Sequence, residues 1–412
     1  MISPDMNQVR GRFPALAREI DGRRVAFLDA PGGSQVPDVV IEAMAGYLRR
    51  SNANVHGAFE TSRETDALID DAHRAAADLL NADPDEVVFG PNATTLLLSI
   101  SRSIARTLGP GDEVVVTRLD HDANVRPWLL AARDAGASVR WVDIRDDDVT
   151  LDGSSFEASL NERTKVVAFT LASNAVGTIP PATELVRIVR ERTDAIIACD
   201  GVHLAQHRRI DARGTGADIV VCSPYKIFGP HLGILYGRRD LLEELDPYKV
   251  RPASDAIPHA FETGTQNHEA FAGWVAAVDY LARLGGSRPN RREALAASFT
   301  DFIEPWEREL AARFLEGITS MSHVRLYGIA DLGRLHERTP TFAVRVGDRH
   351  PFETAKLLAD RGIFVWDGHY YALELMERLG LQETGGAVRI GFCHYNTPDE
   401  VDRTLEELAG LG

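Results

Sequence analysis

Cysteine, lysine and long apolar runs are all scarce in this chain of 412 residues. The three cysteines include no CxxC pair, which excludes a disulfide framework and a cysteine-rich zinc module. No apolar run approaches the roughly 18 residues that a membrane-spanning helix requires. The first residues, MISPDMNQVRGRF, lack the apolar core of a secretory signal peptide. These absences together predict a cytoplasmic protein that does not enter a membrane.

Positive charge is also in short supply. The sequence has 45 basic and 61 acidic residues, a formal net charge of -16, which makes it a poor candidate for binding nucleic acid or anionic membrane. Hydrophobic residues make up 44% and charged residues 26%, so the chain is an ordinary globular protein of two or three domains at about 150 residues each. A lysine at a special position stands out, because only four of the basic residues are lysines: Lys165, Lys226, Lys249 and Lys356.

Short β-branched runs alternate with amphipathic segments through the first two thirds of the chain. The alternation predicts an α/β domain with a mostly parallel seven-stranded sheet and helices on both of its faces. The helical segments cover 94–108, 123–136 and 182–193. The seven expected strands cover 86–90, 113–117, 138–144, 166–172, 195–199, 218–223 and 233–237.

A smaller α+β unit is expected after the Gly- and Arg-rich stretch GGSRPNRRE. Its predicted elements are a strand TFAVRV, a helix HPFETAKLLADRG, a strand IFVWD, a strand AVRIGFCHYN and a capped terminal helix TPDEVDRTLEELAGL. The N-terminal 20 or so residues are expected to pack with it. The predicted domains are therefore 21–288 for the large one, and 1–20 with 289–412 for the small one.

Reactive side chains follow several predicted strands, at the edge where open parallel sheets bind their ligands. Taken singly, each would serve equally well as a helix cap or a turn residue. Together they offer an anion-binding helix start, an imidazole, a carboxylate and an amine. Pyridoxal phosphate uses such a set for its phosphate, its ring nitrogen and its Schiff base. The residues are Thr94, Thr95, His121, Asn174, Asp200, Ser223 and Lys226.

No metal site is expected from the sequence. His203 and His207 have i, i+4 spacing in HLAQH, but this segment has neither an intervening glutamate nor a third ligand nearby. Cys199, Cys222 and Cys393 lie in apolar runs predicted as strands, and we expect them to be inert core residues.

These motifs resemble those of the class V aminotransferase family of fold-type I pyridoxal-phosphate enzymes, and within it the cysteine desulfurase and selenocysteine lyase branch. The resemblance runs from FLDAPGGSQVP (27–37) to RIGFCHYNT (389–397). It implies that Lys226 in SPYKIFGP forms the Schiff base and that Asp200 in CDGVH pairs with the ring nitrogen. His121 in LDHDAN would stack on the ring and help to move protons, and His203 would face the phenolic oxygen. Thr94, Thr95 and Ser223 would hold the phosphate.

The same resemblance implies a homodimer with an active site shared between subunits. Thr265 in FETGTQN would reach the phosphate bound by the neighbouring subunit. Asn174 would orient the substrate, and Arg389 would grip its α-carboxylate through two parallel hydrogen bonds. His56 in NANVHG would line the substrate side.

One segment departs from the desulfurase pattern. Desulfurases of this branch carry Arg-x-Gly-His-His-Cys-Ala, whose thiolate takes sulfur from the substrate, whereas residues 366–372 here read WDGHYYA. Tyr371 occupies the cysteine position and Trp366 the arginine position, and a phenol cannot accept a persulfide. Tyr225 replaces the histidine that usually precedes the Schiff-base lysine, and His203 a common glutamine. We therefore expect the cofactor to be retained and persulfide-type desulfurase activity to be absent.

The favoured function is β-elimination from a cysteine-type or S-substituted cysteine substrate, a C–S lyase reaction with Lys226 as general base. Transamination is the close alternative, and decarboxylation would use the same electron sink. Tyr370, Tyr371 and Trp366 suggest a bulky apolar pocket lip, with a packed domain interface as the equal alternative. Two further alternatives are a scaffold that has lost turnover, which would not need the whole catalytic set, and a dehydrogenase, which would not need the lysine.

Overall fold

The computed structural model describes residues 5–412. A seven-stranded sheet lies at its centre, with strand order β4-β10-β9-β8-β7-β5-β6. β6, β5, β7, β8 and β9 pair in parallel, and β10 is antiparallel to both β4 and β9. The mostly parallel sheet and each of its seven predicted strands are confirmed. The strands are β4 Val87–Gly90, β5 Glu113–Thr117, β6 Ser138–Val142, β7 Thr164–Thr170, β8 Ile196–Asp200, β9 Ile219–Cys222 and β10 Gly233–Gly237.

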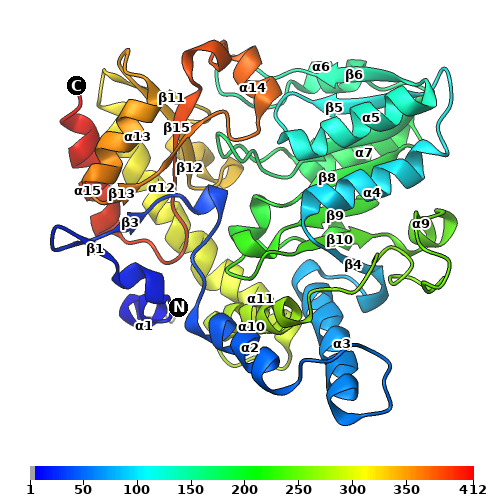
Figure 1. Ribbon diagram of the computed structural model, residues 1–412. Coiled ribbons are helices and arrows are strands. Elements are labelled where there is room, and N and C mark those ends of the chain that lie inside the picture. Colours follow the sequence, from blue (N-terminus) through cyan, green and yellow to red (C-terminus); the bar gives the residue numbers. More distant parts are fainter. Residues whose placement is uncertain (1–4) are drawn as a thin grey trace.

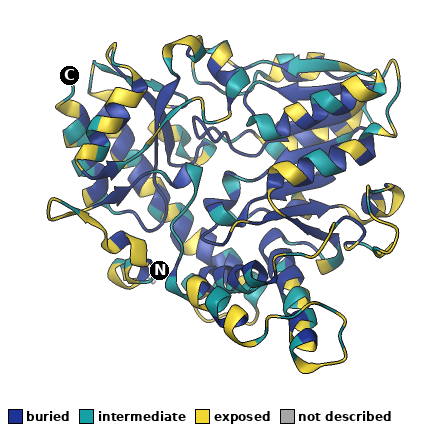
Figure 2. Ribbon diagram, in the orientation of Figure 1, coloured by how far each residue is buried: buried dark blue, intermediate teal, exposed yellow. Residues whose placement is uncertain are grey.

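Helices cover both faces of this sheet, as the periodicity predicts. Successive strand side chains point to opposite faces. Val114 and Val116 of β5 therefore pack with α4 (Ala93–Ala105) and α5 (Arg126–Ala135) on one face. Val115 packs in the core on the other face, which also contains residues of α3 (Glu60–Leu80), α7 (Ala182–Arg192) and α10 (His268–Leu284). Figure 2 shows the strands as the buried centre of the molecule and the helices with exposed outer surfaces.

A second, antiparallel sheet of order β11-β12-β15-β14 forms the smaller unit. Phe314 of α12 packs against Phe342 of β12 in the core of this unit. In Figure 1 the unit lies beside the seven-stranded sheet, and the helices α1 and α15 lie on its side of the molecule. Its elements are β11 Val324–Tyr327, β12 Thr341–Val346, β14 Trp366–Gly368, β15 Ala387–Gly391, α12 Glu304–Thr319, α13 Pro351–Asp360, α14 Leu373–Arg378 and α15 Pro398–Ala409.

Two local predictions are wrong. The run IFVWD forms two strands: β13 (Ile363–Phe364) pairs in parallel with β3 (Ala26–Phe27), whereas β14 pairs antiparallel with β15. The chain changes sheets at Val365 because its two halves find partners on different elements. Cys393 lies two residues beyond the end of β15, outside any strand, although it is buried.

The N-terminal residues contact the smaller unit. Arg10 of α1 (Met6–Gly11) pairs with Glu400 of α15 at 2.9 Å. α11 (Arg291–Ser298) instead packs on α10 and α3, and a π-helical turn (Phe299–Ile303) connects it to α12. Residues 1–4 of the predicted segment 1–20 lie outside the described residues. The domain boundaries themselves stay predictions.

The remaining elements are short or lie at the surface. None of the helices within residues 5–412 is long and apolar enough to cross a membrane. These remaining elements are β1 Glu19–Ile20, β2 Arg23–Arg24, α2 Asp38–Arg50, α6 Gly153–Ala158, α8 Ala212–Thr215 and α9 Arg239–Glu244.

Candidate active site

A cavity of about 770 Å³ lies between the strand ends of the large sheet and the smaller unit. A chamber of about 90 Å³ adjoins it and shares part of its wall. Arg389 and Tyr371 line only the larger cavity, and Asp200, His203 and Ser223 only the smaller. Both are lined by Asn92, Thr94, His121, Ala123, Asn174, Tyr225 and Lys226.

Lys226 ends the 3-10 turn Pro224–Lys226, which follows β9. Its side chain is buried at the wall of both cavities. Burial and the positive charge of Arg389 lower the pKa of the Lys226 ammonium to about 7, against the opposing effect of the Asp200 carboxylate. A substantial fraction of this amine is therefore neutral near neutral pH, the state in which an amine attacks a carbonyl or accepts a proton.

Asp200 is the last residue of β8, and its carboxylate accepts a hydrogen bond from the Val202 N–H at 2.8 Å. Burial raises the pKa of Asp200, while Lys226 acts in the opposite direction. Behind it lies Asp120, which bonds the Thr117 hydroxyl and accepts from the Asn124 amide at 2.7 Å. Burial raises the pKa of Asp120 to about 8, so this neighbour is mostly protonated at neutral pH.

The His121 imidazole is neutral and its tautomer is defined. Nδ1 accepts a hydrogen bond from the Ala123 N–H at 3.0 Å, so the ring proton is on Nε2. Burial, together with Lys226 and Arg389, lowers the pKa of His121 to about 3. The ring stacks on Tyr371 with centroids 5.5 Å apart and an interplanar angle of 11°. His121 thus presents a flat uncharged face to the cavity.

Arg389 is a buried cation on β15. Its Nη1 donates to the Asn174 carbonyl at 2.9 Å, and its guanidinium carbon lies 4.4 Å from the centre of the Tyr370 ring. Burial lowers the pKa of Arg389 to about 10, so the group keeps its charge at neutral pH. Within residues 5–412 it forms no ion pair, and its Nε has no hydrogen-bond partner. A cation in this state is suited to bind a carboxylate that enters the cavity.

Two consecutive tyrosines bring a strained turn to the cavity wall. Tyr370 and Tyr371 have φ of 52° and 59°, in the left-handed region that bulky residues rarely adopt. The Asn174 side-chain amide donates to the Tyr370 carbonyl at 2.8 Å, and the Asp122 N–H donates to the Tyr371 carbonyl at 2.7 Å. The Asn174 Oδ1 atom is buried without a hydrogen-bond partner among the described residues. Asn174 therefore holds the turn with one end of its amide and leaves the other end free.

His203 lies in the smaller chamber, with Nε2 3.0 Å from the Thr341 hydroxyl and 3.2 Å from that of Thr339. Burial holds the pKa of His203 well below its usual value. Its i, i+4 neighbour His207 is 2.7 Å from a Glu307 oxygen. Each histidine thus has a different protein partner.

Three predicted site residues lie outside both cavities. His56 is exposed in the loop between α2 and α3, where its backbone N–H donates to Asp66. Thr95 is exposed, and its N–H is capped by the Asn92 side chain at 2.8 Å. Thr265 is exposed in the segment that precedes α10. Their predicted roles stay predictions.

Sequence reasoning missed three residues that shape the site. Asn92 caps α4 and lines both cavities. The sequence could have indicated it, because asparagine is a favoured N-cap residue and Asn92 in PNATT stands just before a predicted helix. Asp120 directly precedes His121, but no local pattern marks it. Asp29 follows the apolar run VAFL, and burial raises its pKa to about 6 despite the nearby Arg389.

Comparison with known proteins gives one family across almost the whole chain. A family model described as "Aminotransferase class-V" matches residues 26–404. The "Probable cysteine desulfurase" of Streptomyces coelicolor is 32% identical, over 98% of this chain and 96% of its own length. The "Cysteine desulfurase" of Pectobacterium atrosepticum is 30% identical, over 100% of this chain and 98% of its own. The apo structure of cysteine desulfurase from Thermococcus onnurineus NA1 superposes with a TM-score of 0.88 at 27% identity, covering 100% of this chain and 98% of that one.

Proposed function

The chain belongs to the class V aminotransferases, a family of pyridoxal-phosphate enzymes, and on that premise we propose that it is a C–S β-lyase acting on cysteine or S-substituted cysteines. The observation that carries the proposal is a buried lysine, with its pKa lowered to about 7, at the wall of a cavity that also holds an arginine without an ion pair among residues 5–412. An amine and a carboxylate-binding cation on one cavity fit an amino acid as the substrate.

The residues present fit pyridoxal phosphate. Lys226 and Asp200 supply the amine and the carboxylate, and Thr94, Ser223 and the start of α4 supply donors for a phosphate. The buried His203 Nδ1 atom has no partner among the described residues and is available to a polar group in the chamber. The chemistry that the cofactor supplies when bound is a carbonyl for an imine and a ring that accepts electrons.

The chain's own residues then have separate tasks. Arg389 binds the substrate carboxylate, and the Asn174 Oδ1 atom accepts a hydrogen bond from a donor group next to that carboxylate. The neutral Lys226 amine takes the proton from the substrate α-carbon, and the C–S bond breaks as the thiolate leaves from the β-carbon. The thiolate is protonated as it departs, and hydrolysis of the three-carbon product yields pyruvate and ammonia. His121 covers the site with a face that carries no charge.

Elimination without a persulfide is supported by where the thiols lie. No cysteine among residues 5–412 lines either cavity. Cys199, Cys222 and Cys393 are buried, and burial raises the pKa of each thiol, so none is a ready nucleophile. Tyr371, which the family resemblance assigns to the position of the desulfurase cysteine, is 66% exposed. A lyase needs the base and the electron sink but no thiol.

We also propose that the working unit is a cytoplasmic homodimer. In support, Thr265 is exposed and lies outside the cavities of its own chain, so its hydroxyl is free to contact a neighbouring subunit. Phe59, Tyr248 and Val250 are exposed apolar side chains that a partner would cover.

The reaction is tested with the purified holoenzyme, L-cysteine, S-substituted cysteines and common amino acids, with pyruvate and other keto acids quantified and the cofactor absorbance followed. We expect catalytic pyruvate release, chiefly from S-substituted cysteines, and a cofactor band that returns. Lys226→Ala should abolish turnover, whereas Lys165→Ala, an exposed lysine on β7, should not. A band converted once to the amine form and restored by a keto acid would establish a transaminase instead.

The absence of a persulfide step has its own test. Tyr371→Cys should acquire a persulfide on incubation with L-cysteine, detected by mass spectrometry, and the unchanged protein should not. A persulfide on the unchanged protein would overturn this part of the proposal.

A further inference from the structure

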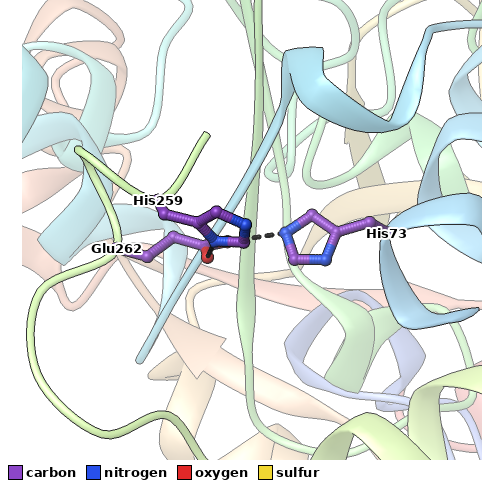
Figure 3. Close-up of side chains that lie close together, drawn as sticks. All are labelled: His73, His259 and Glu262. Atoms are coloured by element: carbon purple, nitrogen blue, oxygen red, sulfur yellow. Dashed lines mark hydrogen bonds and ion pairs between the residues drawn. The ribbon is translucent and has the colours of Figure 1, made fainter. Parts of the chain in front are cut away.

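A cluster of two histidines and a glutamate lies away from the active-site cavities. His73 comes from α3, and His259 and Glu262 from the segment between α9 and α10. One ligand atom from each of the three lies within 4.8 Å of the other two. Figure 3 shows the side chains converging, with His73 and Glu262 reaching toward each other from different elements.

The hydrogen bonds of His73 define which of its nitrogens faces the cluster. Nδ1 lies 2.8 Å from the Ile69 carbonyl, which can only accept, so Nδ1 carries a proton. Nε2 lies 2.9 Å from Glu262 Oε1, which already accepts from the Phe89 N–H at 2.8 Å. If the His73 imidazole is neutral, its Nε2 atom carries a lone pair, and so does the Glu262 Oε1 atom that faces it. A cation, either a proton or a metal ion, must therefore lie between them.

We propose that His73, His259 and Glu262 bind a divalent transition-metal ion, with Zn²⁺ as the best fit. The His259 Nδ1 atom lies 3.1 Å from Glu262 Oε2, so the carboxylate faces both imidazoles. Ligand atoms about 2.0–2.2 Å from a tetrahedral zinc ion stand about 3.4 Å apart. Here the imidazole nitrogens lie 2.9 and 3.1 Å from the two carboxylate oxygens, and one ligand atom from each residue lies within 4.8 Å of the other two. Two imidazoles and a carboxylate are a zinc ligand set, and a single ion satisfies all three groups at once.

The supporting contacts are those of a metal ligand. A metal-bound histidine commonly donates its second N–H to a backbone carbonyl, as His73 does to Ile69. The Phe89 N–H orients the carboxylate in the same manner. The side chains of His73 and Glu262 are 6% and 5% exposed, whereas His259 is 51% exposed and leaves an entry path and room for a water ligand.

The position of the site indicates a structural role. None of its three ligands lines the active-site cavities. The ion would instead join α3 to the segment before α10 through His73 and Glu262, which are 189 residues apart in sequence. β4 would be attached to the same site through the Phe89 N–H. β4 leads into the Asn92 cap of α4, and Glu262 lies three residues before Thr265. Metal binding would therefore hold two segments that flank the proposed phosphate site.

The test uses chelator-treated holoenzyme, equilibrium dialysis against Zn²⁺ alone and elemental analysis. We expect one zinc ion per chain, and a rise in Tm on adding zinc, because the ion binds only the folded state. His259→Ala should abolish both effects, and the variant should fold because the His259 side chain is half exposed. His336→Ala, which removes an exposed histidine elsewhere, should change neither.

Anomalous scattering at the zinc edge then locates the ion. A peak between His73 Nε2 and Glu262 would support the site. The proposal would be overturned by stoichiometric zinc binding in His259→Ala or by a peak elsewhere. It would also be overturned if the unchanged protein bound no zinc, which would mean that a proton, and not a metal ion, lies between His73 and Glu262.

Discussion

Lys226 is subject to two opposed charges. Burial and Arg389 favour its neutral amine, whereas the Asp200 carboxylate favours the ammonium. The first two effects are larger, and the pKa falls from its ordinary value of 10.5 to about 7. An aspartate beside a lysine thus keeps the amine from losing its proton entirely, and the side chain titrates where a general base is most effective.

Cofactor uptake by the apoenzyme should depend on pH through this lysine. Only the neutral amine attacks a carbonyl, so the rate of imine formation should rise with pH with a midpoint near 7. Asp200→Asn removes the charge that raises the pKa, and its midpoint should move to lower pH. Stopped-flow absorbance of apoenzyme mixed with pyridoxal phosphate at a series of pH values measures the midpoints of the unchanged protein and of Asp200→Asn. A midpoint of the unchanged protein near the pKa of free lysine would contradict the prediction.

Arg389 should control substrate binding more than the chemical step. Arg389→Lys keeps the charge but loses the planar pair of donors, so we expect KM to rise roughly 10- to 100-fold with a smaller change in kcat. Steady-state kinetics with the best substrate of the lyase assay provide the measurement. Arg325→Lys, an exposed arginine on β11, is the matched control and should leave both constants unchanged. A selective loss of kcat in Arg389→Lys would contradict the assigned role.

Two capped helix N-termini, those of α4 and α15, support the active site. Asn92 caps α4, which begins at the cavity wall, and Thr397 caps α15, which supports the sheet that carries Arg389. At α15 the Thr397 hydroxyl accepts from the Glu400 N–H, and the Glu400 carboxylate accepts from the Thr397 N–H at 3.0 Å. Glu400 also binds Arg10 of α1, so the capping box joins the N-terminal segment to the end of the chain.

Thr397→Ala should destabilise the protein by about 1 kcal/mol, because it leaves a first-turn N–H of α15 without its side-chain acceptor. Urea unfolding followed by circular dichroism gives the free energy of unfolding. Thr263→Ala, an exposed threonine in the segment before α10, should change it little. Equal stability of the two variants would show that the cap does not contribute.

The arrangement of the two units determines which residues share the cavity. The large sheet contributes Lys226, Asp200 and His121 at its strand ends, and the smaller unit contributes Arg389 and Tyr371. The amine and the carboxylate-binding group therefore lie on different units. A change in how the units pack would alter substrate alignment without removing any catalytic group.

A homodimer should show in the mass and in cofactor affinity. Light scattering should give about 90 kDa, twice the chain mass of 45.2 kDa. Thr265→Ala should weaken cofactor retention during dialysis if this hydroxyl reaches the neighbouring subunit's phosphate, and Thr263→Ala should not. A monomeric mass with full cofactor binding would contradict both the dimer and the shared site.

The sequence alone determined the large sheet and the chemistry at its edge. Strand and helix periodicity is local, so it located all seven strands, and the residues at or shortly after their carboxyl ends include Lys226, Asp200 and His121. The class of cofactor could be inferred from those residue types before any geometry was known. The family resemblance added Arg389 and Tyr371, which come from a distant part of the chain.

Tertiary structure decided what depends on contacts between distant segments. Only packing divides IFVWD between two sheets, buries Asp120 behind Asp200, and lowers the pKa of Lys226 by burying its amine and placing it near Arg389. The same holds for His73 and Glu262, whose separation of 189 residues leaves no spacing to recognise. Hydrophobic periodicity specifies each element by itself, whereas charge interactions and metal ligation depend on distances that arise only when the elements pack together.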